Sequence, residues 1–170
     1  MERTDLLSSR YNLIFLAAGV CILAADQLTK TWIRANLALG DSVFDLGFFR
    51  IYHGSNTGAA FGIFQEGIPV LRIVSVIGLV AVLGCGLFSA RFIPFFNKLA
   101  GKLALGLVLG GVSGNMVDRV WRGQVTDFLD FLYWPAFNVA DASLVIGCAL
   151  LVLLLFREML RERAHHGEGT

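Results

Sequence analysis

Four long apolar runs alternate with polar or mixed segments along the chain. The uncharged stretches are 11–25, 73–90, 103–117 and 142–156. An α-helix needs about 20 predominantly apolar residues to cross a hydrocarbon core about 30 Å thick. Allowing for flanking polar residues, the pattern predicts four transmembrane helices at about 11–32, 70–90, 99–120 and 137–158.

The first apolar run is too short to cross a membrane unless polar residues extend it. Tyr11–Ala25 would rise about 22 Å as a helix, so the span must continue through Asp26 and Lys30 toward Trp32. Asp26 and Lys30 are four residues apart with the acid first, which favours a helical ion pair. A cleaved lipoprotein leader is the alternative, but Val20 stands before Cys21 where a small residue is expected. We interpret the run as a retained first span.

The connecting segments differ in character. In Ser42–His53, apolar or aromatic residues alternate with others, and Asp45–Gly47 has turn composition. This predicts a small amphipathic β-lobe within about 36–67, lying on the membrane surface. Between the third and fourth runs, Pro135 interrupts the segment 125–141, and we interpret Trp134-Pro135 as the end of a loop that precedes the fourth span.

Composition agrees with a membrane protein and excludes several other classes. Hydrophobic residues make up 56% of the 170 residues and charged residues 16%, far from a soluble globule. A net charge of +1 gives no basic field for nucleic acid. The three cysteines lie inside apolar runs and are expected to be small buried hydrophobes. The three histidines are too few and scattered for a metal cluster, so neither a metal nor another cofactor is expected. The fold class expected is therefore an α-helical integral membrane protein, 1–170 forming one domain.

Basic residues favour one orientation of the four spans. An even number of spans places both termini on the same side. Of the 14 basic residues, eight fall on that side: Arg3, Arg10, Arg91, Lys98, Lys102, Arg157, Arg161 and Arg163. Because cytoplasmic segments carry an excess of Lys and Arg, both termini are expected in the cytoplasm.

This orientation gathers acidic residues at the outer leaflet. The first and third spans run outward and the fourth begins there, so their polar ends meet at one level. Four acids (Asp26, Asp118, Asp127, Asp141), two amides (Asn115, Asn138) and Arg119 are expected to converge. Ionisable side chains inside a bilayer are costly and indicate a functional site.

Two neighbouring carboxylates in that cluster suit aspartic proteolysis. They share a proton more easily than both ionise. One can then act as general base on water while the other donates to a carbonyl. Asp127 and Asp141 are the candidates, and the start of a helix favours the ionised form of Asp141. Asp26 with Lys30, and Asp118 with Arg119, are interpreted as structural pairs.

Roles are also expected for the other polar residues. Asn56, Asn115 and Asn138 would orient neighbouring groups or bind peptide. Asp130 is interpreted as a solvated loop acid.

Three other functions agree less well with the sequence. Gly111-Val-Ser113-Gly114 resembles a rhomboid nucleophile motif, but only His53 could supply the base and four spans are too few. A proton-coupled carrier needs polar groups through the full membrane depth, whereas the inner halves of the spans are uncharged. A pure scaffold would leave the polar cluster unexplained.

Taken together, five motifs resemble the bacterial lipoprotein signal peptidase family (type II signal peptidases), and the resemblance covers essentially the whole chain. In order along the sequence they are Asp26-Gln-Leu-Thr-Lys30, Asn56-Thr-Gly58-Ala-Ala-Phe61, Gly114-Asn115-Met-Val-Asp118-Arg119, Val125-Thr-Asp127-Phe128 and Phe137-Asn138-Val-Ala140-Asp141.

The resemblance implies a specific activity. Family members cleave the signal peptide from diacylglyceryl-modified prolipoproteins just before the lipidated cysteine, at the outer leaflet of the inner membrane. They use two aspartates without metal and bind the cyclic peptide globomycin at this site. By resemblance the dyad is Asp127 and Asp141, rather than Asp130. The expected supporting or substrate-binding residues are Asp26, Lys30, Asn56, Gly58, Asn115, Asp118, Arg119, Phe137, Asn138 and Ala140. The expected partners are the lipidated precursor and membrane lipids, with the enzyme a monomer.

Overall fold

A computed structural model of the chain describes residues 2–57, 68–88, 96 and 98–167. The four long helices are α1 (Glu2–Asn36), α2 (Ile68–Phe88), α3 (Leu99–Trp121) and α4 (Val139–Gly167). A small sheet contains β1 (Ser42–Asp45), β2 (Arg50–Asn56) and β3 (Val125–Asp130). All four helices are long and apolar enough to cross a membrane. The predicted fold class, four spans with a small β-lobe, is confirmed. Helices α1 and α4 run beyond the predicted ranges 11–32 and 137–158.

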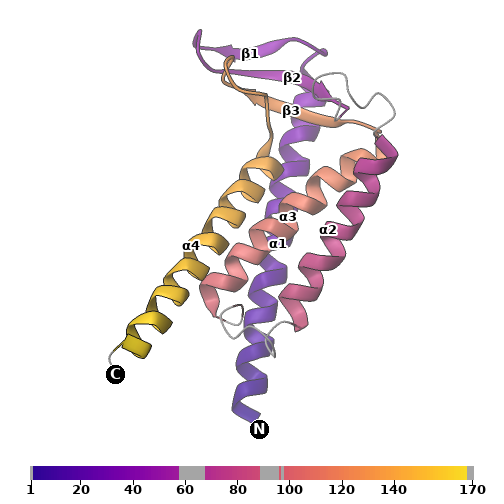
Figure 1. Cartoon of the computed structure of the whole chain (residues 1–170). Helices are drawn as coiled ribbons and strands as arrows, with labels where there is room; N and C mark the ends of the chain where they lie inside the picture. The colour runs from indigo at the N-terminus through magenta and orange to yellow at the C-terminus, as the bar shows by residue number, and fades with distance from the viewer. Residues whose placement is uncertain (1, 58–67, 89–95, 97, 168–170) are drawn as a thin grey trace.

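Helix α3 forms the centre of the bundle and is the most buried of the four (Figure 1). Small residues on one face let it approach α1 closely. A Cβ atom added at Gly106 would lie 2.7 Å from the Cβ of Ala18, and one at Gly110 would lie 2.5 Å from the Cβ of Ile22. Gly106 and Gly110, four residues apart on α3, therefore form a glycine stripe that is the contact surface between α3 and α1.

The end of the bundle opposite the sheet holds a buried cation, which directly precedes the uncharged run 103–117. Lys102 lies inside α3 and is fully buried. Its ammonium donates to Asn12 Oδ1 of α1 at 2.6 Å and to the carbonyl of Gly86 in α2. Between this level and the sheet, the core consists of apolar side chains around Phe15, Leu105 and Leu109. These contacts tie three helices together at one end.

The sheet lies across the other end and has the order β1-β2-β3, with both neighbouring pairs antiparallel. The predicted turn joins β1 to β2. There the amide of Gly47 donates to Asp45 Oδ1 at 2.7 Å, and Gly47 has a φ of +82°. The interpretation of residues 125–130 as loop is wrong, because they form β3 and pair with β2 from Arg50 to Asn56. The segment between α3 and α4 thus belongs to the lobe.

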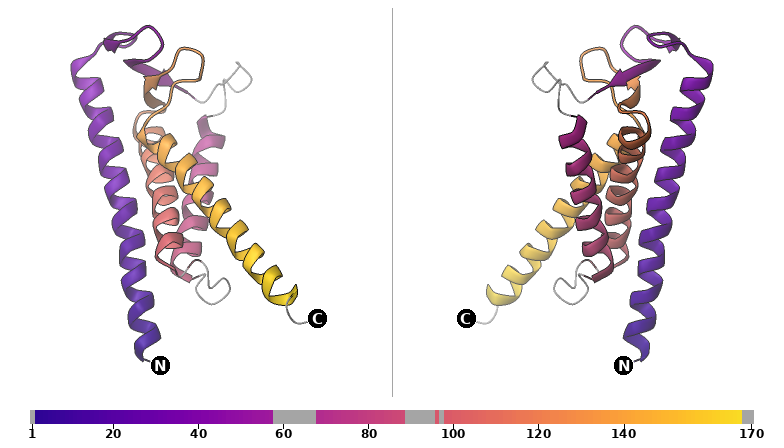
Figure 2. Two further views of the ribbon diagram at one scale, coloured as in Figure 1. Left: turned by 90° about the vertical axis from the view of Figure 1, so that its left-hand side faces the viewer. Right: turned by 90° about the vertical axis from the view of Figure 1, so that its right-hand side faces the viewer.

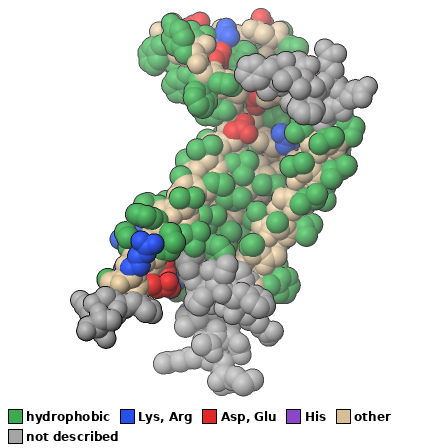
Figure 3. Space-filling model, in the orientation of Figure 1, with side chains coloured by type: hydrophobic (Ala, Val, Ile, Leu, Met, Phe, Trp, Pro, Cys, Tyr) green, Lys and Arg blue, Asp and Glu red, His purple; other side chains and the backbone are tan. Residues whose placement is uncertain are grey.

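Both chain termini lie at the end of the bundle opposite the sheet (Figure 2), and α4 leans away from α1 toward its C-terminus. Apolar side chains cover much of the bundle's outer surface (Figure 3). The three cysteines were expected to be buried, but Cys21, Cys85 and Cys148 are exposed on that surface. In a membrane, lipid chains rather than protein would solvate these positions.

Candidate active site

Helix α4 begins with a reciprocal cap that fixes Asp141. The side chain of Asn138 accepts a hydrogen bond from the backbone amide of Asp141 at 3.0 Å, and Asp141 Oδ2 accepts from the amide of Asn138 at 3.3 Å. This is the arrangement of a capping box, with Asn and Asp in the two positions. Asp141 is therefore held at the positive end of the helix dipole, where a carboxylate is stabilised.

Two asparagines link Asp141 to the second carboxylate. Asn115 Nδ2 donates to Asp141 Oδ1 at 2.7 Å, and Asn138 Nδ2 donates to Asp127 Oδ1 at 2.7 Å. Asn138 Nδ2 also lies 3.2 Å from Asn115 Oδ1. The two amides thus form a bridge between the two carboxyl groups and leave neither side chain free to turn away. Asn115 and Asn138 orient their neighbours as the sequence predicted.

Asp127 reaches this point from strand β3. Its Oδ2 accepts a hydrogen bond from Asn56 Nδ2 of β2 at 2.9 Å. Asp127 pairs with Gly54, where an added Cβ would lie 2.9 Å from the carbonyl oxygen of Asp127. Only glycine allows that close approach. Asp127 is 3% exposed, whereas Asp141 is half-buried.

Burial changes the acidity of Asp127. The pKa of this carboxyl is raised to about 6, chiefly by burial and in smaller part by the negative charge of Asp141, while the hydrogen bonds from Asn56 and Asn138 act in the opposite direction. Asp127 therefore takes up a proton more readily than an ordinary aspartate.

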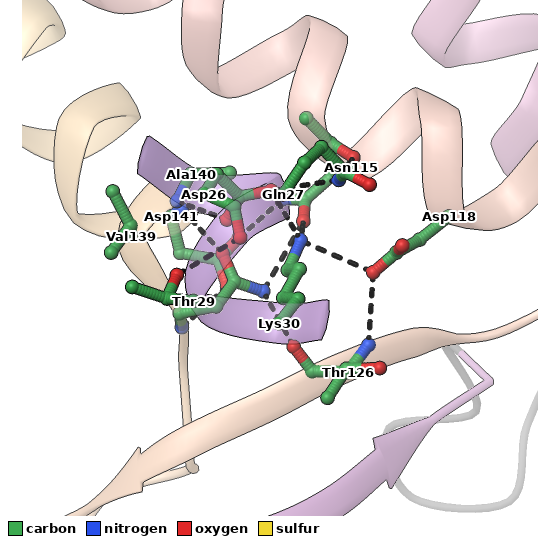
Figure 4. A network of polar contacts seen from close by, with 12 residues as sticks. Asp26, Gln27, Thr29, Lys30, Asn115, Asp118, Thr126, Val139, Ala140 and Asp141 are labelled. Carbon is green, nitrogen blue, oxygen red and sulfur yellow. Dashed lines mark hydrogen bonds and ion pairs between the residues drawn. The ribbon is translucent and has the colours of Figure 1, made fainter. Parts of the chain in front are cut away.

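A buried ionic network centred on Lys30 is connected to Asp141 through Asn115 (Figure 4). Lys30 Nζ lies 2.8 Å from Asp26 Oδ2 and 3.2 Å from Asp118 Oδ2, and it donates to Asn115 Oδ1 at 3.0 Å. All three donor positions of the ammonium are used. The predicted pair of Asp26 and Lys30 is confirmed.

Asp26 also connects α1 to the start of α4. Its Oδ1 accepts a hydrogen bond from the backbone amide of Ala140 at 2.9 Å. Ala140 is fully buried, and its Cβ would lie 3.1 Å from one added at Gly114. A larger residue at either position would separate α3 from α4, so Ala140 contributes through its small size.

Asp118 does not pair with Arg119, contrary to the prediction. It contacts Lys30 and Arg34 of α1 and accepts from the amide of Thr126 at 3.2 Å, which fixes β3 to α3. Arg119 instead donates to Ser75 Oγ of α2 at 3.2 Å. Adjacent residues on a helix point in different directions, so such pairs seldom meet.

Arg34 was missed by the sequence analysis. Its guanidinium donates to Thr126 Oγ1 at 3.1 Å and lies 3.4 Å from Asp118. The sequence did contain a pattern that could have identified it, because residues 26, 30 and 34 are spaced four apart and so lie on one face of a helix.

The interpretation of Asp130 as a solvated acid is also wrong. Asp130 is 7% exposed, and its Oδ2 accepts a hydrogen bond from Arg50 Nε at 2.7 Å. Its Oδ1 accepts from the amide of Leu132 at 2.9 Å. Asp130 therefore stabilises the end of β3, where Leu132 has a φ of +59°.

The remaining predicted residues lie at the edge of the site. Phe137 bridges to Leu129 through backbone hydrogen bonds, and its ring stacks on Phe131 at a centroid distance of 6.0 Å. Gly58, in the second motif, lies outside the described residues.

An apolar groove leads from the membrane face of α4 to Asp141. Its cavity is about 370 Å³ and is lined by Trp134, Phe137, Asp141, Ala142, Val145 and Ile146. Acidic side chains are visible in the recess between the lobe and the helices (Figure 3). The groove could hold an extended apolar chain with its polar end beside the carboxyl groups. Among the described residues, no group of three or more His, Cys, Asp or Glu side chains could hold a metal ion.

Comparisons with known proteins agree on one family. Residues 18–157 match the family model for signal peptidase (SPase) II. The chain is 44% identical over 143 residues to a lipoprotein signal peptidase of Dehalococcoides mccartyi, covering 84% of this chain and 89% of the relative. It is 36% identical over 156 residues to a lipoprotein signal peptidase of Syntrophotalea carbinolica, covering 89% and 96% of the two chains. A solved bacterial membrane enzyme superposes with a TM-score of 0.75 at 31% identity, covering 85% and 88%.

Proposed function

The chain belongs to the signal peptidase II family of aspartic proteases, and we propose that it removes signal peptides from diacylglyceryl-modified prolipoproteins. Cleavage falls just before the lipidated cysteine. The observation that carries this proposal is the pair Asp127 and Asp141, joined through Asn115 and Asn138 at the end of an apolar groove. The groove takes the apolar signal segment or the acyl chains, and the carboxyl groups meet the scissile peptide.

The reaction needs one proton shared by the two carboxyl groups. Asp141, at the positive end of α4, accepts a proton from water, and the water oxygen attacks the scissile carbonyl carbon. Asp127, whose pKa is raised to about 6, donates its proton to the carbonyl oxygen. Collapse of the tetrahedral intermediate breaks the carbon–nitrogen bond, the proton taken up by Asp141 passes to the leaving amine, and one hydroxyl proton of the intermediate returns to Asp127.

The surrounding polar residues position the dyad. Lys30 is neutralised by Asp26 and Asp118, so it can hold Asn115 through a hydrogen bond without adding an unpaired charge. Asn56 supports Asp127 from the neighbouring strand. Globomycin would occupy the same groove and exclude the precursor.

The proposed setting is a bacterial inner membrane. The chain acts as a monomer surrounded by lipid, with both termini in the cytoplasm and the dyad at the outer leaflet. The excess of basic residues near the termini supports this orientation. A proton carrier is disfavoured, because the apolar core around Leu105 and Leu109 separates the polar site from Lys102.

The dyad is tested by Asp127→Asn, Asp141→Asn and the double variant. Each single change should reduce turnover of a lipidated precursor by about 10²- to 10⁴-fold, the usual contribution of a general acid or base. The double variant should be scarcely worse, because residues that act as a unit are strongly non-additive. Purified variants would be assayed in detergent after thermal unfolding has shown that they fold.

The matched control is Asp41→Asn, at an exposed position of the lobe away from the dyad. It should keep near-normal turnover. Near-normal turnover by folded Asp141→Asn would remove the aspartic mechanism.

A further inference from the structure

A second cavity, of about 520 Å³, lies on the other side of strand β3 from the dyad. It is bounded by the sheet-side ends of α1 and α3 and by strands β2 and β3. Arg34 contributes from α1, His53 from β2 and Thr126 from β3. Thr126 and Asp127 are consecutive in β3, so their side chains point to opposite faces of the sheet. The cavity is therefore separate from the peptidase groove.

The lining of this cavity is suited to an anion. Arg34 and Arg122 both line it, together with the polar side chains of His53, Gln124 and Thr126. None of the described residues that line it is acidic. Arginine offers several N–H donors in a fixed planar geometry that matches phosphate oxygens.

A third arginine stands close by. A Cβ added at Gly123 would lie 3.9 Å from Arg72 Nη2 of α2. Arg72 Nε donates to the carbonyl of Arg119 at 2.7 Å, which fixes the guanidinium beside the end of α3. Arg34 of α1, Arg72 of α2 and Arg122, which directly follows α3, thus bring positive charge to one end of α3.

The position of the cavity identifies the source of that anion. The membrane-spanning parts of α1 and α3 both end beside this cavity, at Asn36 and Trp121. The cavity therefore lies at the level where phospholipid phosphates meet the hydrocarbon. Trp121 and Leu39 line it and are largely exposed, at 77% and 65%. An indole at that depth is typical of the membrane interface. A diester phosphate attached to acyl chains fits this mixture of cationic and apolar surface.

We propose that this cavity binds the phosphate of an anionic phospholipid, distinct from the precursor that the dyad cleaves. The proposal does not rest on the peptidase activity. Arg34 connects the two sites, because it lines the cavity and also donates to Thr126, the neighbour of Asp127. A bound phosphate would hold Arg34 in place and thereby stiffen β3 at the dyad.

The test measures lipid binding to the purified full chain in an uncharged detergent. Native mass spectrometry would count bound dioleoyl phosphatidylglycerol, and thermal unfolding would report stabilisation. Phosphatidylcholine and inorganic phosphate are the comparison ligands. Phosphatidylglycerol should bind at least about tenfold more tightly than phosphatidylcholine, a difference that one charge-assisted contact can provide. Inorganic phosphate alone should give no stabilisation at the same concentration.

Two residues that line the cavity are exposed, so substitutions there should leave the fold intact. Arg122→Gln removes a cation, and Gln124→Glu adds a carboxylate of the same size. Each should weaken phosphatidylglycerol binding about tenfold, the effect of one lost or opposed charged contact. Arg10→Gln is the matched control, an exposed arginine at the opposite end of α1, and should bind like the unmodified chain.

Three results would overturn the proposal. These are equal binding of the two lipids, an equal loss in Arg10→Gln and Arg122→Gln, and stabilisation by inorganic phosphate as large as that by the lipid. The last would make the cavity a site for free phosphate.

Discussion

Asn138 connects more of the proposed catalytic site than any other single side chain. Its Oδ1 caps α4 through Asp141, and its Nδ2 holds Asp127. One amide therefore sets the distance between an acid on a helix and an acid on a strand. In the proposed mechanism, this amide holds two carboxyl groups from different elements in position to share a proton.

The pH dependence follows from the environment of Asp127. Because its proton is needed for attack on the carbonyl and its pKa is raised to about 6, kcat/KM should fall as the pH rises above about 6, approaching tenfold per pH unit. Asn56→Ala removes a hydrogen bond that favours the ionised form. The pKa of Asp127 then rises further, and the midpoint of the fall should move to higher pH. The pH profile would be measured in an uncharged detergent, so that the pH at the micelle surface equals that of the buffer.

Ser55→Ala, on the same strand, is the control and should leave the midpoint unchanged. A midpoint that stays fixed or moves to lower pH in Asn56→Ala would contradict the assignment of the proton to Asp127.

At the scale of single residues, the sequence predicted the members of the polar cluster better than their partners. Asp26 and Lys30 share one helix face, so local spacing was sufficient to pair them. Asp118 and Asp130 instead pair with residues distant in sequence, Lys30 and Arg50. Such partners depend on tertiary packing, which no local pattern records.

At the scale of elements, the four spans could be predicted because apolar length alone defines them. Strand β3 could not be predicted in this way. Its six residues are nearly all buried, so they lack the clean alternation of a half-exposed strand. Its partner β2 precedes it by some seventy residues, as in the pairing of Gly54 with Asp127. Without β3, Asp127 and Asp130 both resemble loop acids.

The contact between α1 and α3 gives a prediction at the same scale. Gly110→Ala places a methyl group 2.5 Å from Ile22 Cβ and 2.8 Å from the carbonyl oxygen of Gly19, which is backbone and cannot turn aside. The two helices must separate, at a cost of about 1–3 kcal/mol for overpacking. Thermal unfolding should show a lower Tm, and activity should fall because Lys30 reaches Asn115 across this interface.

Gly84→Ala in α2 is the matched control, since nothing lies within 4 Å of an added Cβ there. Its Tm should be unchanged or slightly higher, because alanine favours a helix over glycine. Equal Tm values for the two variants would show that α1 and α3 do not pack through the glycine stripe.

At the scale of the whole molecule, the polar groups form two levels separated by an apolar core. The charged groups under the sheet are paired with one another and with amide side chains. Lys102, at the far end, is held by Asn12 and a backbone carbonyl. Since charged groups tolerate the membrane best near its surfaces, we expect each polar level to lie near one face of the bilayer.

The orientation of these two faces is the last prediction. In a chain whose three lipid-facing cysteines have been replaced by serine, Cys introduced at Ser42 should react with an impermeant thiol reagent applied to intact spheroplasts. Cys introduced at Arg161 should react only after permeabilisation. Both positions are exposed and lie at opposite ends of the molecule, so accessibility to water differs only by the side of the membrane. The reason is the excess of Lys and Arg beside the termini, which cytoplasmic segments retain.

Activity of the cysteine-free chain is measured first, to ensure that it still folds. The reverse labelling would place Asp127 and Asp141 in the cytoplasm, where an exported precursor could not be cleaved after translocation.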